Sequence, residues 1–160
     1  LYYPTSYNDY DPTGVNGFIQ NSLPFWISKV TVLWHELSLN GSNQVIFQFR
    51  NASGDITSGY NSCSRNSTGG TSFNNTSGFV IGTNSSGHVY SGKMEIQRVA
   101  NLKWVETHLL LKTNSTGTSQ DLRHGGGHLT ISNTVPTGWV ISATGSNNFD
   151  GNTRVTVFYQ

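Results

Sequence analysis

The stretch that decides the fold is residues 26–60, WISKVTVLWHELSLNGSNQVIFQFRNASGDITSGY. Apolar and polar residues alternate over 27–35 and again over 45–50, and both runs are rich in β-branched and aromatic side chains. This period of two is typical of half-buried β-strands. Asn40-Gly41 lies between the two runs, and both residue types accept the positive φ that a primed hairpin turn requires. We therefore predict a central hairpin whose apolar face further strands must cover.

Similar alternation continues along the rest of the chain, and no helical period extends over a useful length. The expected strands cover 15–20, 79–82, 92–99, 102–111, 128–132, 139–143 and 154–160. Many short strands separated by Gly- and Asn-rich turns indicate an all-β chain, an antiparallel, jelly-roll-like β-sandwich with long polar loops. The two longest polar stretches, 59–78 and 112–128, are predicted to be loops. We expect residues 1–16 to form a lead-in segment and 17–160 a single domain.

Composition limits the partners that this chain can have. Only 11% of its 160 residues are charged, the net charge is +1, and neither a basic cluster nor an acidic run occurs. These values argue against nucleic acid and against anionic membranes as partners. No apolar stretch approaches the roughly 18 residues that a membrane span needs. The single cysteine, Cys63, excludes an internal disulfide, and the start at Leu1 suggests a piece of a longer protein.

Two groups of residues could carry chemistry, and we favour a structural interpretation for both. His124 and His128 flank three glycines downstream of Asp121, but so flexible a segment favours a turn over a metal site, which needs preorganised ligands. Glu95 and Glu106 could face each other across a hairpin turned at Asn101, as the paired carboxylates of glycosidases do. The alternation around Glu95 favours a solvated outer face instead. We expect no catalytic residues, no cofactor and no metal.

Binding is the function that the composition favours. Asn, Ser and Thr side chains can match sugar hydroxyls, and aromatic rings can stack on pyranose faces. Counting strands places the two long polar stretches at the same end of the sandwich. The candidate ligand-binding residues that this end would combine are Tyr60, Arg65, Asn66, Phe73, Arg123, His124 and His128.

Several short segments, in order, resemble a known family. They are Ile27-Ser28-Lys29-Val30-Thr31-Val32, Leu37-Ser38-Leu39-Asn40-Gly41-Ser42, Phe47-Gln48-Phe49, Ile56-Thr57-Ser58-Gly59-Tyr60, Ser77-Gly78-Phe79-Val80-Ile81, Gly125-Gly126-Gly127 before Leu129-Thr130, and Phe149-Asp150-Gly151. From about residue 16 onward, their order and spacing are similar to those of the C-terminal receptor-binding domain of bacteriophage tail fibre and tail-spike proteins. The resemblance implies a β-sandwich at the distal end of the fibre in the virion, assembled as a homotrimer, that contacts the host surface. It implies no catalytic residues.

The resulting hypothesis is a non-catalytic tail-fibre tip that attaches the virion to a host surface polysaccharide or lipopolysaccharide without membrane insertion. One alternative is a carbohydrate-binding module of a secreted polysaccharide-degrading enzyme, which a catalytic domain in place of a fibre shaft would reveal. A second alternative is a structural trimerisation head without its own ligand, which glycan-binding measurements on the domain would distinguish.

Overall fold

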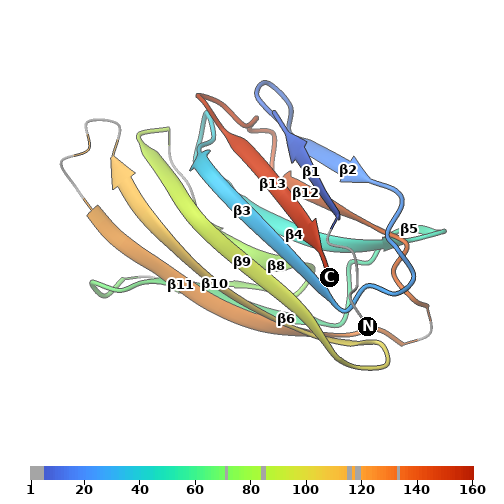
Figure 1. Cartoon of the computed structure of the whole chain (residues 1–160). Coiled ribbons are helices and arrows are strands. Elements are labelled where there is room, and N and C mark those ends of the chain that lie inside the picture. Colours follow the sequence, from blue (N-terminus) through green and yellow to red (C-terminus); the bar gives the residue numbers. More distant parts are fainter. Residues whose placement is uncertain (1–5, 71, 84–85, 115–116, 118–119, 133) are drawn as a thin grey trace.

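The computed structural model of the chain describes residues 6–70, 72–83, 86–114, 117, 120–132 and 134–160. These residues form two antiparallel β-sheets packed face to face and no helix (Figure 1). The predicted β-sandwich is therefore confirmed. The described residues also contain no helix long and apolar enough to cross a membrane.

The larger sheet has eight strands, and every pairing in it is antiparallel. Across the sheet the order is β1 (Ser6–Tyr10), β13 (Arg154–Tyr159), β3 (Lys29–Leu37), β9 (His88–Ala100), β10 (Lys103–Asn114), β11 (Gln120–Thr130), β6 (Tyr60–Asn66) and β7 (Phe73–Asn75).

The smaller sheet covers the inner face of the larger one. Its strand order is β2 (Gly17–Gln20), β12 (Gly138–Ala143), β4 (Gln44–Asn51) and β5 (Gly54–Asp55), and β8 (Phe79–Thr83) also pairs with β4. The edge strand expected at 15–20 is confirmed as β2.

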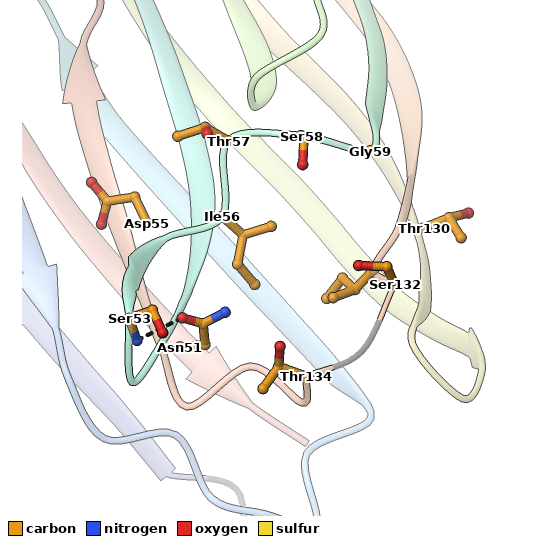
Figure 2. Close-up of a pocket in the computed structure, with 11 residues that line it drawn as sticks. Asn51, Ser53, Asp55, Ile56, Thr57, Ser58, Gly59, Thr130, Ser132 and Thr134 are labelled. Carbon is orange, nitrogen blue, oxygen red and sulfur yellow. Dashed lines mark hydrogen bonds between the residues drawn. The ribbon is translucent and has the colours of Figure 1, made fainter.

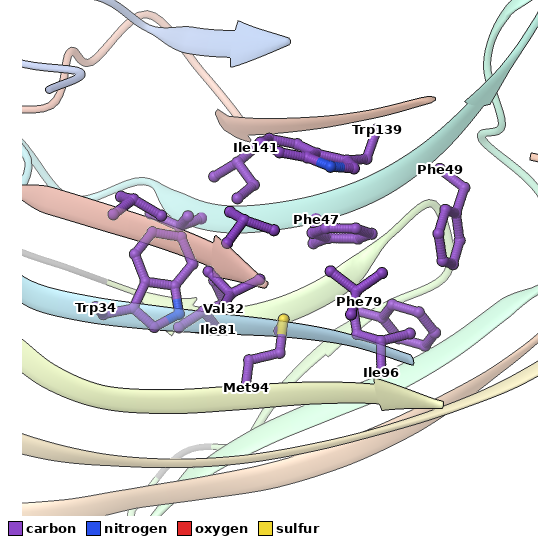
Figure 3. Packing of buried hydrophobic residues seen from close by; sticks show 14 of the residues in the cluster. Val32, Trp34, Phe47, Phe49, Phe79, Ile81, Met94, Ile96, Trp139 and Ile141 are labelled. Carbon is purple, nitrogen blue, oxygen red and sulfur yellow. The ribbon is translucent and has the colours of Figure 1, made fainter. Parts of the chain in front are cut away.

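The core lies between the sheets, and the alternating pattern of the sequence explains which residues fill it. In β3, Val30, Val32 and Trp34 are buried, whereas Leu33 and His35 are exposed on the outer face. The smaller sheet contributes large aromatic side chains, which pack against the buried, mostly aliphatic side chains of the larger sheet (Figure 3). Burial of this apolar surface is the main stabilising term of the fold.

The predicted central hairpin is wrong. Strand β3 belongs to the larger sheet and β4 to the smaller one, so the segment around Asn40-Gly41 crosses from one sheet to the other. Neither Asn40 nor Gly41 has a positive φ. Gly41 instead lies against Asn147, whose side chain would have to move to accommodate a Cβ atom at this position.

The two long polar stretches contain strands where we predicted loops. Residues 59–78 contain β6 and β7, and 112–128 contain the end of β10 and most of β11. The sequence suggests loops because small polar residues, such as Ser62 and Ser64, occupy inward positions where apolar ones are usual. Strands β6 and β11 pair directly, so the two stretches do lie side by side.

The segment predicted as a lead-in also contributes a strand. Its described part includes β1, which pairs with β13 at the edge of the larger sheet. Tyr10 at the end of β1 faces inward, and its ring packs edge-on against Trp139 with 5.4 Å between centroids. Residues 1–5, which contain Tyr2 and Tyr3, lie outside the described residues.

Candidate functional site

A polar hollow of about 420 Å³ opens at one end of the sandwich. Three segments form it: the β4–β5 turn, the β5–β6 connection and the start of the β11–β12 connection (Figure 2). We call it the terminal hollow. The described residues that line it are Asn51, Ser53, Asp55, Ile56, Thr57, Ser58, Gly59, Thr130, Ile131, Ser132 and Thr134.

Local hydrogen bonds hold the wall of the terminal hollow in place. In the β4–β5 turn, Asn51 Oδ1 accepts a hydrogen bond of 2.8 Å from the Ser53 amide. Asn and Ser favour such turns because their side chains bond the nearby backbone. The Ile56 amide then donates to the Phe49 carbonyl at 2.8 Å, which fixes the chain as it leaves β5.

Gly59 closes the wall against the neighbouring strand. Its φ is +89°, a conformation that glycine adopts without steric cost. A Cβ atom at this position would collide with the Thr130 carbonyl oxygen. The two backbones meet because the Gly59 carbonyl accepts a hydrogen bond of 3.1 Å from the Thr130 amide.

The surface of the terminal hollow is chemically suited to a polar, uncharged ligand. Exposed hydroxyl groups come from Thr57, Ser58 and Thr130, and each can both donate and accept hydrogen bonds. Ile56 and Ile131 supply apolar surface and are themselves only 8% and 7% exposed. Ligand sites in proteins combine apolar surface with placed polar groups, and the terminal hollow has both, with polar groups in the majority.

A second hollow of about 460 Å³ adjoins the first and shares Asn51 and Ser53 with it. Arg50 lines this second hollow, and two acceptors hold its guanidinium group. The Arg50 Nε atom lies 2.6 Å from Asp55 Oδ1, and Nη1 donates to Asn21 Oδ1 at 3.0 Å. The polar surface therefore continues past the β4–β5 turn.

The seven residues predicted to bind a ligand lie in three separate places. Tyr60 alone occupies the first of them. Its side chain is 4% exposed and lies in the core. The hydroxyl oxygen accepts a hydrogen bond of 2.8 Å from the Phe49 amide. Burial raises the pKa of Tyr60 well above its ordinary value. Tyr60 therefore connects the two sheets and is not available to a ligand.

Asn66, Phe73 and Arg123 come together, as predicted, but around a buried guanidinium group. Arg123 is 2% exposed, and its Nη2 atom donates to Asn66 Oδ1 at 2.6 Å. Its Cζ atom lies 5.0 Å from the centre of the Phe73 ring and 5.3 Å from that of Tyr90. Burial lowers the pKa of Arg123. The guanidinium group is therefore buried beneath Asn66 and Phe73, which are themselves half-buried.

Arg65, His124 and His128 lie on the outer face of the larger sheet. Arg65 and His124 are directly opposite each other on β6 and β11, and His128 is opposite Asn61. All three predicted residues are exposed. The triple glycine between the histidines is part of β11, so the expected turn is wrong. Within the described residues, no three His, Cys, Asp or Glu side chains come close enough to hold a metal ion.

The structure also contains a buried polar relay that our sequence analysis missed. His108 Nε2 lies 2.9 Å from Ser64 Oγ, and His108 Nδ1 lies 2.8 Å from Glu106 Oε1. The Ser64 hydroxyl donates to the Ile81 carbonyl, and all three side chains are buried between the sheets. The sequence does contain a signal for this position. Glu106 and His108 alternate in phase with Trp104, which places them on the inner face of the sheet.

Glu95 and Glu106 do not form a carboxylate pair. The hairpin turned at Asn101 is confirmed, but Glu95 lies opposite Thr107 and Glu106 opposite Ile96. Because neighbouring positions of a strand point to opposite faces, the two carboxylates are separated by the sheet. Glu95 lies on the outer face, as expected, and pairs there with Lys29 at 2.7 Å. Glu106 is buried, so the solvated outer position expected for it is wrong.

No family model, curated protein or solved structure matches the chain.

Proposed function

We propose that this chain is a non-catalytic receptor-binding domain of a bacteriophage tail fibre, and that it attaches to a host surface glycan at the terminal hollow. The observation that carries the proposal is the lining of this hollow. An amide, several hydroxyl groups and exposed backbone surround a small apolar surface contributed by Ile56 and Ile131. The resemblance to tail fibre and tail-spike domains supports the same proposal.

Binding without cleavage agrees with the position of the relay. In a serine hydrolase the nucleophilic hydroxyl must reach the substrate and donate its proton to the histidine. Ser64 is fully buried, and its hydroxyl donates to the backbone of Ile81. We therefore assign Ser64, His108 and Glu106 to the packing of the sandwich and not to a reaction.

The proposal includes a homotrimer, for which the outer face of the larger sheet is the best candidate interface. Leu109 and Leu111 on this face are 52% and 41% exposed, and Leu33 and Leu122 are 39% and 44% exposed. Leu111 lies opposite Leu122, and only Lys93 separates Leu33 from Leu109 across the sheet. Apolar residues on one face are what a permanent oligomer interface requires.

The test is whether the chain binds glycan on intact bacteria. Fluorescently labelled chain is mixed with a panel of bacterial cells, before and after mild periodate oxidation, which destroys vicinal diols of sugars. We expect binding to at least one strain to be lost after periodate and retained after protease treatment of the cells. Binding that survives periodate and is lost after protease treatment would contradict the proposal, because the receptor would then be a protein.

A further inference from the structure

We infer that the terminal hollow selects uncharged sugar residues and excludes acidic ones such as uronic acids. This inference depends on the proposed function, because it concerns the ligand of the same hollow. It comes from the distribution of charge among the described residues around the site.

The lining of the terminal hollow includes no cationic side chain among the described residues. Its one ionisable side chain is Asp55. A sugar carboxylate that entered would lose water without gaining an opposite charge, and burial of an unpaired charge is strongly unfavourable. Hydroxyl and amide groups can pair with sugar hydroxyls and would leave such a carboxylate poorly compensated.

Arg50, the cation that lines the adjoining hollow, is held away from this role. Its guanidinium is engaged by Asp55 Oδ1 through Nε and by Asn21 Oδ1 through Nη1. Arg50 lines the adjoining hollow and not the terminal one. An acidic sugar would have to separate Arg50 from Asp55 to gain an ion pair, and it would then leave the Asp55 carboxylate unpaired beside it.

Matched sugar pairs that differ only at C6 test the inference. The isotopically labelled chain is titrated at pH 7 with glucose, galactose and mannose, and with glucuronate, galacturonate and mannuronate. Backbone amide shifts of Ser58, Gly59 and Thr130 report occupancy of the terminal hollow. We expect at least one neutral hexose to shift these signals, with a Kd at least tenfold lower than that of its uronate.

A gain of charge supplies the second half of the test. Ser58→Lys places the missing cation at the hollow, and we expect the ratio of uronate Kd to hexose Kd to fall at least fivefold. Equal or tighter binding of a uronate to the wild-type hollow, or an unchanged ratio in Ser58→Lys, would overturn the inference and leave the proposed function intact. If no sugar of either kind shifts these amides, the proposed glycan site itself is contradicted, and the inference with it.

Discussion

Ser64 Oγ lies 2.9 Å from His108 Nε2, and the two residues come from β6 and β10, which are separated by β11. The contact passes over Gly125 of the intervening strand. A Cβ atom at Gly125 would collide with the His108 ring and with the Cys63 carbonyl oxygen. The glycine therefore makes room for a polar relay that joins β6 and β10 across β11 on the inner face of the larger sheet.

One assignment of the protons satisfies both contacts of the Ser64 hydroxyl. In it, the Ser64 hydroxyl donates to the Ile81 carbonyl and accepts a hydrogen bond from His108 Nε2–H. One further proton is then shared between His108 Nδ1 and Glu106 Oε1. Burial raises the pKa of Glu106, and its second oxygen has no hydrogen-bond partner among the described residues. Both observations favour a protonated Glu106 that donates a hydrogen bond to His108 Nδ1.

This proton arrangement makes Gln a close substitute for Glu106. In Glu106→Gln the amide N–H can donate to His108 Nδ1, so we expect the free energy of unfolding at pH 7 to fall by less than about 1 kcal/mol. Glu106→Leu leaves the ring nitrogen unpaired, and we expect a loss of about 1–3 kcal/mol. Urea denaturation of both variants measures the difference. Equal losses would mean that the pair is an ion pair.

Glu106→Gln should also change how the stability of the chain depends on pH. Because the pKa of Glu106 is raised above its ordinary value of 4.5, its contribution to stability is fully present below pH 4.5 and is lost as pH rises through the folded pKa. Glu106→Gln lacks this titration. We therefore expect the stability of the wild type relative to Glu106→Gln to decrease as pH rises above 4.5. A relative stability that increases with pH would show that the carboxylate is charged in the folded chain.

Gly125→Ala tests the space beneath the relay. The added methyl group must displace the His108 ring or the Cys63 backbone, so we expect a loss of about 1–3 kcal/mol, as in other overpacked interiors. Gly70→Ala is the matched control, because the nearest heavy atom to its added Cβ would be 3.9 Å away. Thermal unfolding compares the two variants. Similar melting temperatures would mean that the strands around Gly125 separate easily.

Much of the fold could be predicted from the sequence because burial alternates along most strands. In β3, the buried residues Val30, Val32 and Trp34 follow the alternation predicted over 27–35. The hairpin predicted at Asn40-Gly41 was wrong, because local turn propensity does not determine which sheet the next strand joins. Most of β11 was missed, although its end falls in the strand predicted at 128–132. The requirement for Gly125 comes from His108 on a neighbouring strand, and a local pattern does not contain that information.

The candidate site could be predicted less well than the fold. Arg and Tyr are residue types that often bind ligands. In this structure, however, Arg123 and Tyr60 are buried and no ligand can reach them. The terminal hollow is formed where the 51–59 segment meets the chain after β11. Ser and Thr in turns are common in every β-protein, so only the topology shows that these particular ones surround a hollow.

The trimer prediction is tested at Leu109. Light scattering should give about three times the 17.5 kDa chain mass for the wild type. We expect Leu109→Lys to give the mass of a single chain, because a charge would be buried without a partner in the interface. Val135→Lys is the control, since Val135 is similarly exposed at 51% but lies outside the larger sheet. A wild-type monomer, or a trimer that persists in Leu109→Lys, would contradict the prediction.

Filling the terminal hollow with a large side chain tests most directly whether the chain attaches to its receptor there. Ser58→Trp introduces a large side chain at an exposed lining position, and Ser146→Trp introduces the same side chain in the β12–β13 connection at the opposite end of the sandwich. Both variants are compared with the wild type as competitors of labelled wild-type chain on cells that bind it. We expect Ser58→Trp, while folded, to compete at least tenfold more weakly and Ser146→Trp to compete as well as the wild type. Full competition by Ser58→Trp would contradict receptor binding at the terminal hollow.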